Sequence, residues 1–164
     1  MNLGCANDIK EGWINTDSVY RPEFHDIVEI WDARHSRHWN YDDFDFVLVN
    51  HVLCTMREED VHAVLKNCYD MLRTGGTLQV IDMDLNKVFE AYQRGDSDAI
   101  PIKEGDIDSK LCFAISGYGT RPSLFTQKRM QDLLMNTGFA KTRSLLESEY
   151  DTRPDESFVI EATK

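Results

Sequence analysis

Short apolar runs alternate along the chain with segments in which apolar residues recur at helical spacing. The clearest run is DFDFVLVNHVL at 43–53, which predicts a strand buried on both faces. Weaker strand-like runs precede and follow it, at 1–4, 13–17, 26–32, 77–85, 140–146 and 156–164. The pattern therefore predicts seven strands, the last two of them consecutive.

Three segments have the period of an amphipathic helix. The longest, residues 55–76, carries a stripe made of Val61, Val64, Leu65, Cys68, Met71 and Leu72. Thr55 and Glu58 match a capping box at its start, and Gly75-Gly76 predicts its end. Residues 85–96 and 125–139 predict two more helices, the second stopping at Gly138.

Residues 95–123 are rich in Gly, Asp, Ser and Pro and show no sustained period. An irregular stretch of that length is uncommon inside a compact domain and often forms a functional lid. We expect either a lid or a plain surface insertion within a single domain that spans 1–164, because no second domain or internal repeat is visible.

Strands that alternate with helices predict an α/β fold with a parallel sheet, and such sheets bind ligands at the carboxyl ends of their strands. The residues that follow the first four strands are therefore the candidates for chemistry. They are the GCAND turn that begins at Gly4, then Asp17, then Asp32-Ala33, and finally Asn50 with His51. Glycine suits a sharp turn close to a ligand, and a carboxylate such as Asp17 can accept hydrogen bonds from a ribose diol.

The composition narrows the function classes. The 164 residues carry a formal net charge of −11 and no basic cluster, which disfavours nucleic acid and fits a small molecule or a cationic group. No apolar run approaches the roughly 20 residues of a membrane helix, and the first residues do not resemble a signal peptide. The four cysteines form no CxxC pair, so we predict no metal site and a reduced, cytoplasmic protein.

A dinucleotide-dependent oxidoreductase fits this pattern badly. The GxGxxG fingerprint needs Gly or Ala where Ile9 stands. It also places its acidic residue roughly 20 positions downstream, whereas Asp17 follows Gly4 by only 13.

Three blocks of the chain, MNLGCANDIKEGWINTD, DFDFVLVNHVL and VLKNCYDMLRTGGTLQVIDMDL, resemble another family. In order and spacing they are similar to the class I S-adenosylmethionine-dependent methyltransferases. The closest likeness is to a branch whose blocks read LGCG…GWINVD, FDxVxxxHVLEH and VLKPGG. The resemblance extends from Asn2 to Lys164.

The resemblance implies a Rossmann-like, doubly wound and mostly parallel seven-stranded sheet with a C-terminal antiparallel hairpin. It implies S-adenosylmethionine as cofactor, with a loop of Leu3, Gly4, Cys5 and Ala6 beneath its methionine part. Asp17 would then hold the ribose, and Asp32 with Ala33 would face the adenine. Asn50 and His51 would lie near the sulfonium, and His51 is the candidate catalytic base if the acceptor is a hydroxyl or an amine.

The function implied is transfer of a methyl group to a small-molecule acceptor by in-line displacement. Two departures leave a second reading open: Ala6 stands where the family has Gly, and Cys54 and Thr55 replace the acid and second His of HVLEH. The alternative is therefore a catalytically degenerate relative that binds the cofactor or a partner. As partners we expect a small-molecule acceptor and a second copy of the chain in a homodimer, with no nucleic acid and no membrane.

Overall fold

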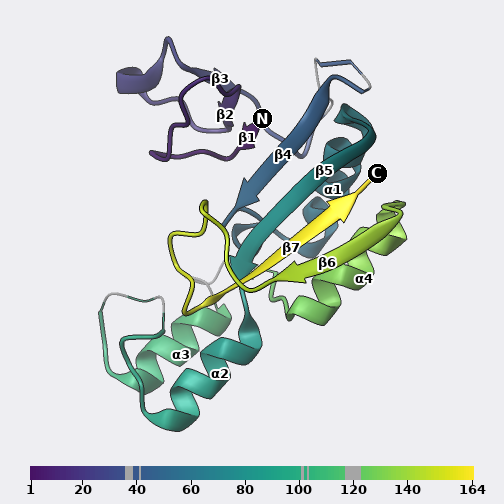
Figure 1. The fold of residues 1–164 in the computed structure, drawn as a ribbon. Coiled ribbons are helices and arrows are strands. Elements are labelled where there is room, and N and C mark those ends of the chain that lie inside the picture. Colours follow the sequence, from purple (N-terminus) through teal and green to yellow (C-terminus); the bar gives the residue numbers. More distant parts are fainter. Residues whose placement is uncertain (36–38, 41, 101, 103, 117–122) are drawn as a thin grey trace.

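The computed structural model describes residues 1–164 except 36–38, 41, 101, 103 and 117–122. Its centre is a seven-stranded sheet in the order β3-β2-β1-β4-β5-β7-β6 (Figure 1). The strands are β1 Asn2–Leu3, β2 Asn15–Asp17, β3 Val28–Ile30, β4 Phe44–Asn50, β5 Leu72–Met83, β6 Lys141–Leu145 and β7 Ser157–Thr163. The first five pair in parallel, and β7 runs antiparallel to both β5 and β6. The predicted Rossmann-like sheet with its C-terminal antiparallel hairpin is confirmed.

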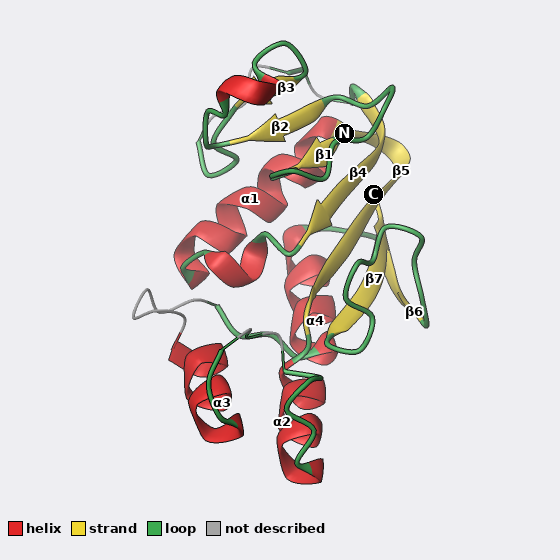
Figure 2. Ribbon diagram, turned by 90° about the vertical axis from the view of Figure 1, so that its left-hand side faces the viewer, coloured by secondary structure: helices red, strands yellow, loops and turns green. Residues whose placement is uncertain are grey.

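The helices are α1 Glu58–Met71, α2 Leu85–Arg94, α3 Ile107–Ser116 and α4 Gln127–Thr137, with short 3-10 turns η1 Pro22–Phe24 and η2 Leu53–Thr55. Figure 2 shows α1 and α4 on one face of the sheet, where the largest buried apolar cluster lies. Met130, Leu133 and Leu134 of α4 are buried there, as their spacing predicts. No helix in the described part of the chain is long and apolar enough to cross a membrane.

Loop side chains cover the opposite face of the sheet. Leu48, Ile81 and Val159 form a second buried cluster, and Trp13 and Tyr150 pack on it. The rings of Trp13 and Tyr150 meet edge to face, with centroids 5.5 Å apart. Trp13 belongs to the crossover between β1 and β2, which is too short for a full helix, so aromatic side chains supply the cover instead.

The start and end of α1 differ from the predicted ones. The Thr55 hydroxyl donates to the carbonyl of Val52, 2.7 Å away, inside η2, and the N-cap residue of α1 is Arg57, whose side chain makes no capping bond. The predicted capping box is therefore wrong. The helix ends at Met71 because Leu72 is already extended, with ψ 138°, so Gly75-Gly76 lies within β5 and does not stop the helix.

The segment predicted to be irregular, 95–123, contains α3. Its helical period is hidden because apolar residues lie on both sides of the helix: Ala114 is buried, whereas Ile115 is 41% exposed. Figures 1 and 2 show α3 beside α2 beyond the carboxyl end of β5. Val88, Ala91 and Ile100 join Ala114 in a small core between them. Positions 101, 103 and 117–122 of the predicted lid lie outside the described residues.

Candidate functional site

The turn after β1 has the backbone that the sequence predicts. Gly4 has φ +66°, and a Cβ built on it would lie 2.5 Å from Cγ2 of Val52. Only glycine fits that position without displacing Val52. Ala6 also adopts a left-handed conformation, with φ +46°, at the place where the resembled family has glycine.

Asp17 ends β2 and bonds to the same turn. One carboxylate oxygen accepts from the Ala6 amide at 2.8 Å, and the other accepts from the Val19 amide at 2.8 Å. Arg21 forms an ion pair with it at 3.3 Å, and Asp17 is only 7% exposed. Its carboxylate therefore holds the β1 turn against the end of β2. Asp17 itself lines neither of the two cavities beside this turn, whereas its neighbour Ser18 lines the first.

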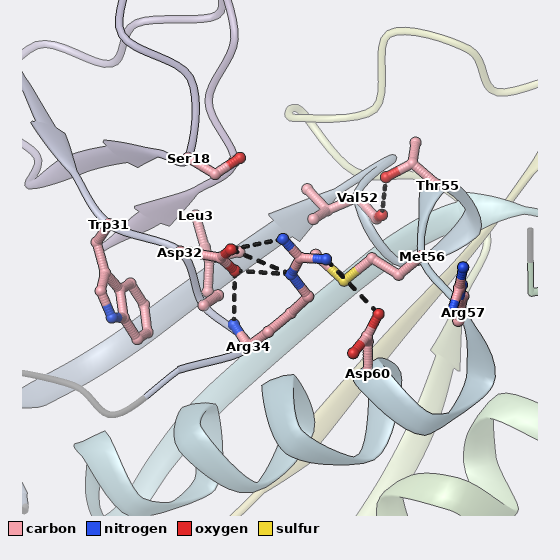
Figure 3. A pocket seen from close by; sticks show the side chains of 12 residues that line it. Leu3, Ser18, Trp31, Asp32, Arg34, Val52, Thr55, Met56, Arg57 and Asp60 are labelled. Atoms are coloured by element: carbon pink, nitrogen blue, oxygen red, sulfur yellow. Dashed lines mark hydrogen bonds and ion pairs between the residues drawn. The ribbon is translucent and has the colours of Figure 1, made fainter. Parts of the chain in front are cut away.

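The first cavity has a volume of about 400 Å³, within the usual range for small-molecule sites. It brings together Leu3, Gly4, Asp32 and Ala33, four of the predicted cofactor residues (Figure 3). The other lining residues are Ser18, Trp31, Arg34, Val52, Thr55, Met56, Arg57 and Asp60. Several of these follow β4 or begin α1, so the rule that ligands lie at strand ends could have found them.

An ion-pair network runs across one side of this cavity (Figure 3). The guanidinium of Arg34 donates to both oxygens of Asp32, at 2.9 Å from Nε and 2.6 Å from Nη2, and also reaches Asp60 at 3.7 Å. The hydrogen bond from Arg34 lowers the pKa of Asp32 to about 2. Asp32 is therefore ionised at neutral pH and can accept from the amino group of a ligand.

The second cavity, of about 280 Å³, brings together Cys5, Ala6, Asn50 and His51, the other predicted site residues apart from Asp17. Its lining residues are Asn2, Gly4, Cys5, Ala6, Asn7, Asp8, Asn50, His51, Thr152 and Arg153. The last two belong to the loop between β6 and β7. Gly4 borders both cavities, so the glycine turn separates two adjoining spaces.

Asn50 has an unsatisfied acceptor at the second cavity. Its Nδ2 donates to the carbonyl of Tyr150 at 2.8 Å, while its buried Oδ1 makes no hydrogen bond among the described residues. A buried acceptor left without a partner costs about 1–3 kcal/mol. A ligand that donates a hydrogen bond at this place would remove that cost.

His51 follows β4 in a left-handed conformation, with φ +53°. Its Nε2 lies 3.0 Å from the hydroxyl of Ser157, which itself donates to the carbonyl of Arg153 at 2.7 Å. Because the single hydroxyl proton is used there, Nε2 carries the imidazole proton and Nδ1 keeps its lone pair. Burial, assisted by the charge of Arg153, lowers the pKa of His51 to about 4, so the ring is neutral at pH 7.

Cys5 contributes its backbone to the turn. Its amide donates to the carbonyl of Thr16 at 2.9 Å, and its side chain is buried. Burial and the nearby charge of Asp17 raise the pKa of its thiol to about 11. A thiol in that state is inert, so its predicted place in the cofactor loop rests on its backbone.

A family model described as "Methyltransferase domain" matches residues 7–80, from just after Ala6 into β5. The predicted family resemblance is confirmed. The methyltransferase match thus covers the ends of β2, β3 and β4 but not Gly4 and Ala6 of the β1 turn. No curated protein matches this sequence.

Solved methyltransferase structures share the fold. A SAM-dependent methyltransferase from Archaeoglobus fulgidus has a TM-score of 0.68 at 12% identity, with 99% of this chain and 84% of that chain covered. A possible histamine N-methyltransferase from Thermotoga maritima has a TM-score of 0.62 at 17% identity, with 99% and 80% covered. The trans-methyltransferase CalH, in complex with SAH, has 0.60 at 15%, with 99% and 50% covered.

Proposed function

We propose that this protein transfers a methyl group from S-adenosylmethionine to a small-molecule acceptor. S-adenosylmethionine is the cofactor named for the Archaeoglobus fulgidus methyltransferase whose fold this chain shares, and CalH was solved in complex with SAH. The observation that carries the proposal is the Gly4 turn, which borders one cavity lined by Asp32 and Ala33 and another lined by Asn50 and His51. Two adjoining spaces at one strand edge suit a donor and an acceptor.

The residues present fit the cofactor. The tight glycine turn lets the backbone of Gly4 line both cavities, and the orphan Oδ1 of Asn50 offers an acceptor to a ligand amino group. Asp32 would accept from the adenine amino group beside Ala33, and the loop of Leu3, Gly4, Cys5 and Ala6 would lie beneath the methionine part. Asp17 would act on the ribose side, where Ser18 lines the first cavity.

The chain's task in such a reaction is alignment and exclusion of water. S-adenosylmethionine, when bound, supplies a methyl group on a sulfonium, which leaves by in-line displacement. Holding donor and acceptor in line lowers the barrier by several kcal/mol without a protein nucleophile. Neutral His51 lines the second cavity, but its pKa of about 4 makes it a weak base for the proton of a hydroxyl or amine acceptor. Positioning is therefore the main contribution of the protein.

The acceptor class is argued from the second cavity. Its volume of about 280 Å³ admits a small molecule, and Asp8 and Arg153 place one charge of each sign on its wall. The net charge of −11 argues against a nucleic-acid acceptor.

Calorimetry with S-adenosylhomocysteine, followed by transfer of labelled methyl to a panel of hydroxyl, amine, thiol and carboxylate acceptors, tests the proposal. We expect one bound cofactor per chain, with weaker binding in Asp32→Asn and unchanged binding in Asp26→Asn, whose side chain is 82% exposed. Absence of binding would overturn the proposal. Binding without transfer to any acceptor would favour the degenerate, cofactor-binding alternative.

We propose further that the protein works in the cytoplasm as a homodimer. Four free cysteines support a reducing compartment. β3 is one of the two outer strands of the sheet and carries Ile30, which is 47% exposed. Near it in the chain, Val19, Tyr20 and Ile27 are also exposed. An apolar edge strand is a surface on which a second copy can pair. Light scattering on the purified chain gives the mass, and a monomer mass would reject the dimer.

A further inference from the structure

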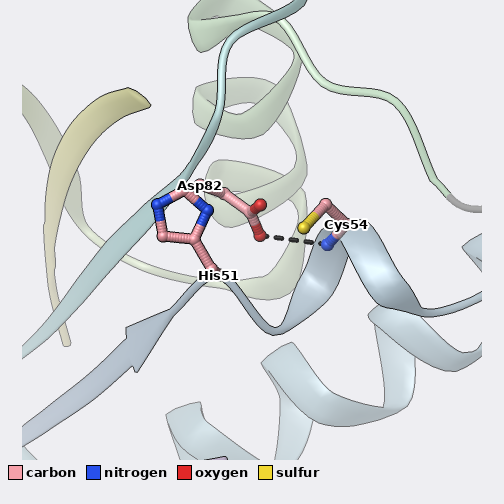
Figure 4. A group of neighbouring side chains, drawn as sticks. All are labelled: His51, Cys54 and Asp82. Carbon is pink, nitrogen blue, oxygen red and sulfur yellow. Dashed lines mark hydrogen bonds between the residues drawn. The ribbon is translucent and has the colours of Figure 1, made fainter. Parts of the chain in front are cut away.

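Three side chains with different ligand atoms converge beneath the ends of β4 and β5. His51 follows β4, Cys54 lies in η2, and Asp82 is the next-to-last residue of β5 (Figure 4). One nitrogen, one sulfur and one oxygen atom from these residues lie within 4.8 Å of one another. Their spacing in sequence does not resemble a metal motif, because the cluster forms only when β5 pairs beside β4.

The fold aims the His51 ring at the other two residues. The His51 amide donates to the carbonyl of Ile81 at 2.8 Å, which fixes the backbone beside Asp82. Since Nε2 donates to Ser157, the free lone pair is on Nδ1. Figure 4 shows Nδ1 on the side of the ring that faces Asp82 and Cys54. A second hydrogen bond that fixes the tautomer is the usual support of a metal-ligating histidine.

Asp82 is a fully buried carboxylate without a cation. One oxygen accepts from the Cys54 amide at 3.0 Å and the other from the Met83 amide at 2.8 Å, and the Cys54 thiol also donates to the carboxylate. Among the described residues, Asp82 forms no ion pair. The charge of Arg153, on the loop before β7, is balanced by Glu156 at 3.3 Å. A buried carboxylate is stable when it is paired or coordinates a metal.

We propose that His51, Cys54 and Asp82 bind one divalent transition-metal ion of the zinc class. A thiolate and a carboxylate balance the two positive charges, and neutral imidazole completes the set. Sulfur and imidazole ligands favour zinc or cobalt over magnesium and calcium, which prefer oxygen alone. Ligand atoms on one tetrahedral zinc lie roughly 3.3–3.8 Å apart. The three ligand atoms, which lie within 4.8 Å of one another, would move closer together around the ion by changes in the side-chain torsions of Cys54 and His51.

Three protein ligands leave the fourth position of a tetrahedral ion open, as in catalytic zinc sites. His51 also lines the second cavity, so the ion would lie at the wall of that cavity. In the metal-bound form Nδ1 is a ligand, and His51 cannot at the same time accept a proton there. The test of the metal site is independent of the proposed methyl transfer, because metal binding is measured without cofactor or acceptor.

The test is a titration of chelator-treated protein with Co²⁺, whose absorption reports its ligands. We expect one equivalent to bind, with the charge-transfer absorption of a cobalt–thiolate bond, and Zn²⁺ to displace it while Mg²⁺ does not. Cys54→Ala should remove the charge-transfer absorption. Cys112→Ala is the matched control, since Cys112 is exposed and remote from the cluster in sequence, and should keep it.

The variant His51→Gln is a second test of the metal site, and it does not alter the buried core. We expect it to weaken Co²⁺ binding at least tenfold, with an unchanged circular dichroism spectrum. The proposal is overturned if the wild-type protein shows no thiolate absorption, if that absorption survives Cys54→Ala, or if Cys112→Ala abolishes it. It is equally overturned if His51→Gln, still folded, binds Co²⁺ as the wild type does.

Discussion

Gly4 is the residue on which the site depends most directly, since strain and a clash both oppose a side chain there. Gly4→Ala would impose a left-handed conformation on alanine and bring its Cβ within 2.5 Å of Val52. We expect the free energy of unfolding to fall by about 2–4 kcal/mol, the sum of strain and overpacking. Urea unfolding measures the change.

Gly12→Ala is the matched control for this prediction. Gly12 has a similar φ of +76° and nothing within 4 Å of a built Cβ, so its substitution measures the cost of backbone strain without a clash. It should cost only about 1–2 kcal/mol. Combining Gly4→Ala with Val52→Ala should recover part of the loss, because the two clashing methyl groups are then gone. If both glycine variants lost the same unfolding free energy, the contact with Val52 would contribute nothing to the loss, and the predicted clash would be wrong.

Asp17 combines a structural bond with a proposed ligand contact. Asp17→Ala leaves the Ala6 and Val19 amides without their acceptor, so the protein without ligand should lose about 1–3 kcal/mol of unfolding free energy. We also expect its affinity for S-adenosylhomocysteine, measured by calorimetry, to fall at least tenfold. Asp26→Ala, at an exposed carboxylate, should change neither quantity. Loss of stability with affinity retained would reject the ribose-side role of Asp17.

Sequence reasoning names candidate residues but not their bonds, and one of those candidates, Asp17, lines neither cavity. The strand-end rule predicts Gly4, Asp32 and Asn50, and each of them lines a cavity. It could not predict that Arg34 joins Asp32 to Asp60, because that network depends on a side-chain conformation and on a helix 28 positions away in the chain from Asp32. Asp82 was missed for the same reason: only strand pairing brings it to Cys54.

Among the elements, those with a single apolar face were predictable from the sequence. α4 buries the residues that its period indicates and ends at Gly138, which adopts a left-handed C-cap. The start of α1 was not predictable from its capping residues, because Thr55 bonds within η2 before the helix begins. α3 was hidden because its apolar residues surround the helix, a pattern that only its packing on α2 explains.

α3 lies within the segment predicted to form a lid, so its hydrogen exchange tests that prediction. It packs in a small core with α2 and Ile100, so its amides should exchange faster than those of α1 and α4, which pack in the main core. The amide of Ser123 donates to the carbonyl of Met56, a residue of the first cavity, at 2.8 Å. We therefore expect S-adenosylhomocysteine to slow exchange in α3, measured by mass spectrometry. Identical exchange with and without ligand would leave the segment a structural insertion.

The molecule as a whole places its helical core on one face and its cavities at one edge of the sheet. Because both cavities border the same turn, a cofactor that spans them would tie β1, β2 and β4 together. Ligand binding should therefore stabilise the entire fold, and the size of the effect follows from mass action.

At a free concentration 100 times its dissociation constant, S-adenosylhomocysteine should add about 2.7 kcal/mol to the unfolding free energy. For a chain of 164 residues that corresponds to a rise in melting temperature of roughly 5–10 °C. The measurement is a melting curve with excess chelator present, so that metal binding does not contribute. Asp32→Asn should show a smaller rise at the same concentration, and NAD⁺ should produce none. The ribose–adenine half is common to both ligands, so an equal rise with NAD⁺ would mean that the cavities do not recognise the methionine part and would reopen the dinucleotide alternative.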